Sequence, residues 1–79
     1  MGKKIKYRHL NTVLLGLGFT YILYGDVQIY REDEHDALII FTKVDPENDV
    51  SDFNLLAVQN TLYWKMMLTR KEIDVLVMN

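Results

Sequence analysis

The sequence contains no cysteine and only one proline, Pro46. Without cysteine, neither a disulfide framework nor a thiolate metal site can hold the fold together, so a hydrophobic core must do so. Apolar residues make up 49% of the chain, which is typical of an ordered globular protein and not of a disordered one. The 79 residues suffice for one domain, residues 1–79. A core of this size buries only about 60% of the surface that the unfolded chain exposes, so a homodimer or another partner would add to its stability.

The sequence also lacks an apolar run long enough to cross a membrane. Its longest run, from Val13 to Tyr24, is about a dozen residues, whereas a membrane-spanning helix needs roughly 20. Basic residues precede this run, as they do in a signal peptide. The residues after it, Gly25-Asp26-Val27, do not form a small-residue cleavage site. We therefore expect a cytoplasmic protein that does not contact a membrane.

Negative charge is missing from the first ten residues, and positive charge is scarce in the middle of the chain. Residues 1–10 carry four positive charges, whereas residues 25–52 carry nine acids and only two basic residues, a local charge of −7. A broad nucleic-acid surface is not supported, because the acidic middle would repel phosphate. A small basic edge could still contact RNA, and its cations are Lys3, Lys4, Lys6 and Arg8.

The acidic middle offers the opposite kind of surface. Residues 32–36 read Glu-Asp-Glu-His-Asp, which is too polar to bury, so we expect an exposed connection between two elements. A negative surface of this kind would steer association toward a positively charged partner. The candidate partner-binding residues are Glu32, Asp33, Glu34 and Asp36.

The first half of the chain predicts one helix and three strands. Apolar residues at helical spacing predict a helix from Tyr7 to Leu17, and Gly18 follows at the left-handed position that often ends a helix. The third strand is apolar at nearly every position, which predicts burial on both faces or a partner along it. The three strands are the β-branched and aromatic segments Phe19–Tyr24, Val27–Arg31 and Ala37–Thr42.

The second half predicts two helices after a loop around Pro46. Ser51 or Asp49 can cap the first of them. The second begins at a capping box, because Thr69-Arg70-Lys71-Glu72 matches the pattern S/T-x-x-E. We expect Tyr63, Trp64 and Met67 to lie at the flanks of the first helix and to pack against the second. The apolar stripe expected to face the core consists of Leu55, Val58, Leu62 and Met66.

Together these elements predict an α+β fold with the order α-β-β-β-α-α. Strands that follow one another through short turns pair in antiparallel fashion. Helices that precede and follow such strands pack most simply on one face of the sheet. The expected architecture is therefore a three-stranded antiparallel sheet with the helices on one face.

With this element order, the chain resembles the HicA family of small toxins, which share a double-stranded-RNA-binding-domain-like fold. The resemblance extends from residue 7 to about residue 77. It includes a loop near Pro46, the helix from Val50 to Leu62, and a tail that looks like the closing segment of longer family members. The matching pieces are Leu17-Gly18-Phe19, the hairpin turn Gly25-Asp26-Val27, the aromatic Tyr30 and the tail Leu68-Thr69-Arg70-Lys71-Glu72-Ile73.

The resemblance implies an mRNA interferase, but the residue that would carry the activity is absent. Family members that cleave RNA have Gly-Ser-His at the hairpin turn, where this chain has Gly25-Asp26-Val27. A valine cannot transfer a proton, so we assign no catalytic residue. The two histidines, His9 and His35, do not align with the family's catalytic position, and a weak nuclease that uses either of them is the least favoured alternative.

Two functions remain in view. The first is a HicA-like domain that binds RNA or an antitoxin without catalysis. The second is a small acidic interaction or inhibitor module with no nucleic-acid role. His35 lies among acidic residues, but their spacing matches no known metal loop, and no phosphate-binding glycine motif is present. We therefore expect neither a metal nor a cofactor.

Overall fold

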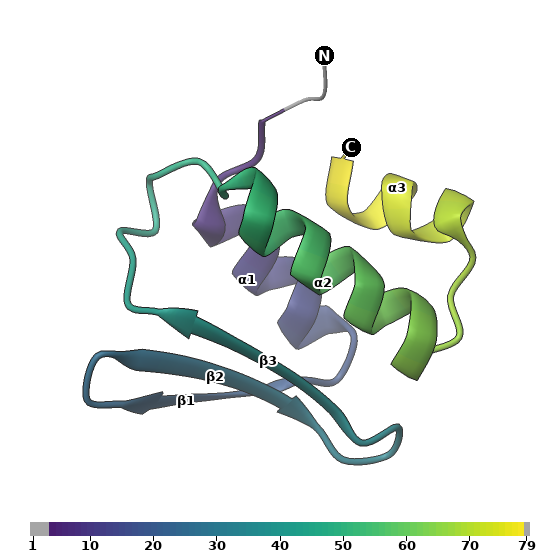
Figure 1. Ribbon diagram of the computed structural model, residues 1–79, viewed down its shortest axis with the longest axis horizontal. Coiled ribbons are helices and arrows are strands. Elements are labelled where there is room, and N and C mark those ends of the chain that lie inside the picture. Colours follow the sequence, from purple (N-terminus) through teal and green to yellow (C-terminus); the bar gives the residue numbers. More distant parts are fainter. Residues whose placement is uncertain (1–3, 79) are drawn as a thin grey trace.

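A computed structural model describes residues 4–78 and, within this range, leaves the side chains of residues 77 and 78 undescribed. Figure 1 shows a sheet with its helices on one side, as the sequence predicts. The order α-β-β-β-α-α is confirmed. The elements in the described range are α1 (Tyr7–Gly16), β1 (Thr20–Tyr24), β2 (Val27–Glu32), β3 (Ala37–Thr42), α2 (Asp52–Lys65) and α3 (Arg70–Met78).

The first helix ends one residue earlier than predicted, at a Schellman motif. Gly18 has a φ of 99°, which an L side chain rarely adopts. The amide of Gly18 donates to the carbonyl of Leu15, and the amide of Phe19 donates to the carbonyl of Leu14, both at 3.1 Å. These two bonds satisfy carbonyls at the end of α1. Phe19 is therefore part of the helix end, its side chain is buried, and β1 begins at Thr20.

The sheet has the strand order β1-β2-β3, and both pairings are antiparallel. Ile22 lies opposite Ile29, and Ile29 lies opposite Ile40. Because side chains alternate between the faces of a strand, this register assigns each residue to the inner face, under the helices, or to the outer face. The inner face carries Tyr21, Leu23, Gln28, Tyr30, Glu32, Ala37, Ile39 and Phe41.

Two helices and the inner face of the sheet enclose the core. Leu10 and Leu14 of α1 and Val58 and Leu62 of α2 are almost fully buried. The sheet contributes Tyr30, Ile39 and Phe41, and α3 contributes Ile73. Tyr7 of α1 and Ala37 of β3 are also buried, and the segments between the elements add Ile5, Phe19 and Val50.

Both predicted caps of the C-terminal helices are present. The amide of Asn54 donates to Oγ of Ser51 at 3.1 Å, so Ser51, and not Asp49, caps α2. The amide of Thr69 donates to Oε1 of Glu72 at 2.9 Å, and the amide of Glu72 donates to Oγ1 of Thr69 at 3.1 Å. This reciprocal pair is the capping box that the sequence predicts before α3.

Two predictions about burial are wrong. The strand β3 alternates between buried and exposed positions, so Leu38 and Ile40 lie on an outer face that no described element covers. Trp64 and Met67 are 74% and 83% exposed, so α3 does not cover them. Tyr63 does meet α3, because the Arg70 guanidinium lies 5.5 Å from the centre of its ring. Within residues 4–78, no helix has both the length and the apolar character that a membrane-spanning segment needs.

Candidate partner-binding surface

The turn that carries the family resemblance contains no histidine. Gly25 has a φ of 60°, as a type II′ hairpin turn requires at its first central residue. Val27 is the first residue of β2 and pairs with Tyr24. His35 lies at the opposite end of β2, and His9 lies on α1. Neither histidine therefore substitutes for the residue missing at position 27.

The strand β1 is the least covered element of the sheet. All five of its residues are exposed, because the helices sit over β2 and β3 and leave the inner face of β1 open at Tyr21 and Leu23. Its only strand neighbour in the described chain is β2, so one side of its backbone is unpaired. The strand, with the sequence Thr-Tyr-Ile-Leu-Tyr, carries no charge and no proline. Natural edge strands usually carry charged residues or proline, which block pairing with other chains.

The outer face of the sheet continues this open surface. A row of three isoleucines, Ile22, Ile29 and Ile40, crosses it from edge to edge. Leu38 and Tyr24 add further exposed apolar area. One charged residue, Arg31, shares this face, and its Nε donates to Oδ1 of Asp33 at 2.8 Å. A contiguous apolar face with so little charge is typical of an interaction site.

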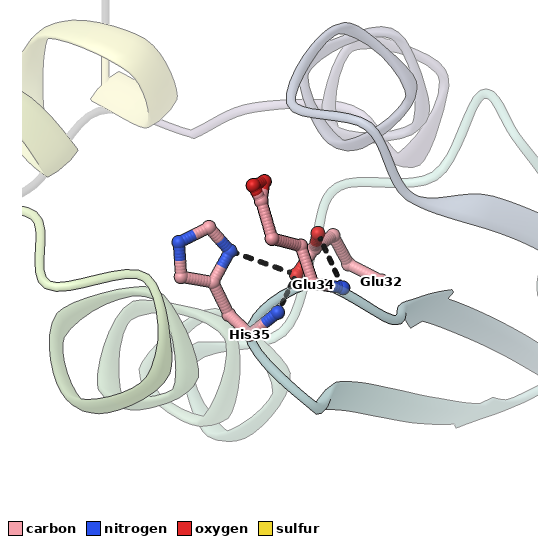
Figure 2. Close-up of side chains that lie close together, drawn as sticks. All are labelled: Glu32, Glu34 and His35. Carbon is pink, nitrogen blue, oxygen red and sulfur yellow. Dashed lines mark hydrogen bonds and ion pairs between the residues drawn. The ribbon is translucent and has the colours of Figure 1, made fainter.

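The turn between β2 and β3 is held by a buried carboxylate, which corrects the prediction that residues 32–36 are all exposed. Glu32 is the last residue of β2 and points to the inner side. Its Oε1 accepts hydrogen bonds from the backbone amide of His35 at 2.8 Å and from Nδ1 of His35 at 3.0 Å. Its Oε2 accepts a bond from the amide of Glu34 at 3.0 Å. Figure 2 shows these contacts, with the carboxylate of Glu34 pointing away from them.

The environment of Glu32 favours its charged form. Burial raises the pKa of a carboxyl group, but the hydrogen bonds from His35 and from the Glu34 amide outweigh burial and lower the pKa of Glu32 below its ordinary value. Oxygen and nitrogen atoms of Glu32, Glu34 and His35 lie within 4.8 Å of one another. Both oxygens of Glu32 already accept bonds that fix the turn, so the arrangement is that of a carboxylate cap.

The other acidic candidates are exposed. Asp33 pairs with Arg31, while the carboxylates of Glu34 and Asp36 make no hydrogen bond to another described residue. Asp36 adopts a φ of 54°, a conformation in which aspartate and asparagine are enriched. Of the four predicted partner-binding residues, Asp33, Glu34 and Asp36 are therefore accessible, and Glu32 serves the turn.

The basic candidates at the N-terminus are largely committed to a neighbouring loop. Nζ of Lys6 donates to the carbonyl of Glu47 at 3.0 Å, and Nε of Arg8 pairs with Oε2 of Glu47 at 2.9 Å. Lys6 and Asp49 form an isolated antiparallel bridge. Lys4 is exposed, and Lys3 lies outside the described residues. The structure thus brings Lys6 and Arg8 together around Glu47, whose carboxylate pairs with Arg8 and whose backbone carbonyl accepts from Lys6.

A cleft between α1 and the inner face of the sheet was not predicted. Its volume is about 360 Å³, and the open part of the β1–β2 hairpin forms one wall. The hydroxyl of Tyr30 donates to Oδ1 of Asn11 at 2.6 Å, and Nε2 of Gln28 donates to the hydroxyl of Tyr21 at 3.1 Å. Burial, with a smaller effect from nearby Tyr21, raises the pKa of Tyr30 to about 12. The alternation of β2 points Gln28 and Tyr30 inward, which is the sequence signal that could have located this cleft.

The two histidines lie in different surroundings. Nε2 of His9 is buried and has no hydrogen-bond partner among the described residues. Nδ1 of His35 is engaged by Glu32. Comparison with family models, with curated proteins and with solved structures finds no match for this chain.

Proposed function

We propose that this chain is a HicA-like toxin-family domain that works by binding a protein partner of the antitoxin type and does not cleave RNA. The partner contributes a β-strand that pairs with the free edge of β1. The observation that carries the proposal is the exposure of all five residues of an uncharged edge strand. We also propose that the chain is located in the cytoplasm, where the product of an adjacent gene could bind it.

Strand addition fits the chemistry of this edge. Main-chain hydrogen bonds to the unpaired side of β1 would supply affinity, and side chains on alternate faces would supply specificity. On the outer face, an added strand would extend the isoleucine row beyond Ile22. On the inner face, it would cover Tyr21 and Leu23, which the helices leave open. The partner would therefore need an apolar strand without charged residues at its centre.

The arrangement of the cations argues against RNA as the main ligand. Phosphate binding depends on free Lys and Arg side chains that release counterions from the nucleic acid. Lys6 and Arg8 contact Glu47 instead. A short RNA should therefore bind weakly. Binding that weakens steeply with salt, and that is lost in the variants Lys4→Ala and Arg8→Ala, would favour RNA over a protein partner.

Co-expression with the products of the adjacent genes tests the proposal. We expect one of them to form a stable complex, in which hydrogen exchange of the amides of residues 20–24 slows. The variant Leu23→Lys should weaken this complex, whereas Leu38→Lys should not, although the two leucines are 48% and 50% exposed. The proposal fails if no neighbour binds, or if the two variants weaken binding equally. Under this proposal, expression of the chain alone should not arrest bacterial growth, because the chain binds its partner and cleaves no RNA. Growth arrest that is relieved by changing His9 and His35 to alanine would contradict the proposal.

The exposed acids at the β2–β3 turn favour a second candidate, an acidic module that binds a basic partner. Glu34 and Asp36 project from a turn that the Glu32 carboxylate holds in place. The double variant Glu34→Gln with Asp36→Asn would remove two charges and keep the turn geometry. If this candidate is correct, the variant slows association and makes it less sensitive to salt, since charge steers encounter. If strand addition is correct, Leu23→Lys in β1 weakens the complex more than the double variant Glu34→Gln with Asp36→Asn does.

A further inference from the structure

The outward side of α2 carries a second apolar surface, separate from the sheet. Its exposed residues are spaced three or four apart and share one helical face. Phe53 is 81% exposed, Leu56 55% and Trp64 74%. The ring of Tyr63 lies 5.2 Å from that of Trp64, in an edge-on arrangement. We call Phe53, Leu56, Ala57, Asn60, Tyr63 and Trp64 the α2 stripe.

The α2 stripe is not needed to bury the core. The opposite side of the same helix carries Val58 and Leu62, which have no exposed area. In Figure 1, α1 and α2 lie on the same side of the sheet and α3 lies beyond them. The helix α3 meets α2 beside Tyr63 and Asn60, and the two helices leave a small gap of about 60 Å³ there. The stripe therefore remains open along Phe53, Leu56 and Trp64.

The order of residues in the stripe is symmetric about Asn60. Leu56 precedes Asn60 by four positions and Trp64 follows it by four. Ala57 precedes Asn60 by three positions and Tyr63 follows it by three. If two copies of α2 pack in antiparallel fashion with Asn60 on the twofold axis, Trp64 meets Leu56 of the other copy and Tyr63 meets Ala57. A twofold interface requires this kind of self-complementarity.

From this symmetry we infer that the chain forms a homodimer through an antiparallel pair of α2 helices. The stripe carries no charged residue, so no like charges meet across the axis. The two Asn60 amides would face each other, and an asparagine in an apolar helix interface fixes register. With about 200 Å² for each aromatic side chain and the exposed fractions of Phe53, Tyr63 and Trp64, these three residues expose on the order of 400 Å² per chain. Two copies would then remove roughly 800 Å² of aromatic surface from water, the size of a weak, reversible interface.

The first test is sedimentation equilibrium of the unmodified chain from low micromolar to near-millimolar concentration. We expect a reversible monomer–dimer equilibrium with no larger species. A chain that stays monomeric at every concentration would overturn the inference and would leave the stripe to another occupant. A dimer that survives in Trp64→Lys would overturn it as well, because its interface would lie elsewhere.

A cysteine crosslink tests the register, since the chain has no cysteine of its own. In Asn60→Cys the two thiols would meet on the axis, within the Cα separation of about 4.4–6.8 Å that a disulfide needs. In the control Phe53→Cys the two thiols would be about 21 Å apart along the helices, at 1.5 Å per residue. Mild oxidation should crosslink the first variant rapidly and the second slowly. Equal rates would contradict the antiparallel arrangement.

Complementation provides a stricter test. Leu56→Glu and Trp64→Lys should each raise the dimer dissociation constant by at least about thirtyfold, the change expected for a central interface residue. When the two variants are mixed, the antiparallel register places the introduced carboxylate opposite the introduced ammonium at one end. At the other end it restores the original pair of Leu56 and Trp64. The mixture should therefore dimerise when neither variant does, and failure of this rescue would exclude the register.

The experiments separate this inference from the proposed function. Leu23→Lys alters β1 and should leave the dimer intact, while Trp64→Lys should leave strand addition at β1 intact. Circular dichroism of each variant shows whether the monomer is folded. The crosslinking comparison does not depend on charged substitutions, so it still decides the question if Leu56→Glu or Trp64→Lys fails to fold.

Discussion

The two faces of α2 are both apolar, yet only one of them holds the fold together. The inward face places Val58 and Leu62 against the sheet and α1, with no area left exposed. The outward face carries residues as large and as apolar, and they lie in solvent. Hydrophobic residues are enriched in cores, but an exposed apolar patch indicates an interaction. The difference between the two faces therefore separates residues that stabilise the monomer from residues that are available to a partner.

The two asparagines of α2 show the same division. Asn54 lies on the inward side, where its Nδ2 donates to the hydroxyl of Tyr7 at 2.8 Å. Asn60 lies on the outward side and is exposed. A polar group that is covered by the fold needs a partner within the fold, whereas an exposed one can bind water or another chain.

The largest effect should come from a cavity on the inward face. Leu62→Ala removes a fully buried side chain and should lower the free energy of unfolding by about 2–5 kcal/mol. Leu56→Ala, on the outward face of the same helix, should change the stability of the monomer by less than about 0.5 kcal/mol. Urea denaturation followed by circular dichroism measures both. Similar losses in the two variants would show that the outward face is also part of the core.

The β2–β3 connection offers the next test, at a buried and an exposed glutamate two residues apart. Because the pKa of Glu32 is lowered in the folded state, its charge stabilises the fold above the unfolded-state pKa, and this stabilisation is lost as the pH falls through the folded-state pKa. Glu32→Gln should therefore be less stable than the unmodified chain at neutral pH, and the difference should shrink below about pH 4.3, the ordinary glutamate value.

The matched control for this experiment is Glu34→Gln, two residues along, at an exposed position. It should leave the dependence of stability on pH close to that of the unmodified chain. Thermal denaturation over a range of pH provides the comparison. A constant difference between Glu32→Gln and the unmodified chain at all pH values would contradict the role given to the carboxylate.

A smaller effect is expected at the start of α2. Tyr7→Phe removes the hydroxyl that accepts from Nδ2 of Asn54 at 2.8 Å and from the amide of Ser51 at 3.4 Å. The loss should be about 1 kcal/mol, since a partly buried amide is left without its partner. In the double variant Tyr7→Phe with Asn54→Ala, the second change should cost less than Asn54→Ala costs alone. Additive losses would show that the two side chains do not interact.

The smallest effect is expected on the outer face of the sheet. Ile40→Thr keeps a β-branched side chain and replaces exposed apolar surface, so it should change the free energy of unfolding by less than about 0.5 kcal/mol. Its inner-face counterpart, Ile39→Thr, places a hydroxyl in the core and should be clearly destabilising. Parallel urea curves for the two variants are sufficient. Equal destabilisation would indicate that both faces of β3 are covered.

The sequence predicts the elements well because their signals are local. Gly18, Ser51 and the Thr69–Glu72 pair act within a few residues of their own positions, and each performs the predicted role. The sequence also indicated the buried face of α2, since the predicted stripe of Leu55, Val58, Leu62 and Met66 lies in or against the core. It did not show that Trp64 and Met67 would stay exposed. The burial of Glu32 could not be predicted from the sequence. A carboxylate that caps a turn is the same kind of residue as the exposed acids beside it.

Of the candidate site, the sequence located the acidic turn, but not the open edge of β1. Exposure of β1 depends on where the helices lie over the sheet, which is a tertiary property. The same is true of the pairing of Lys6 and Arg8 with Glu47, about forty positions away along the chain. Long-range contacts of this kind decide whether a basic segment is free to bind RNA.

The central claim is that the outward apolar residues, such as Leu56, Trp64 and Ile40, do not stabilise the folded monomer. The most direct test is the urea midpoint of a triple variant, Leu56→Gln with Trp64→Gln and Ile40→Thr, measured by circular dichroism at a concentration where the unmodified chain is monomeric. We predict the same midpoint and slope as for the unmodified chain. A fall in the midpoint as large as that of Leu62→Ala would contradict the claim.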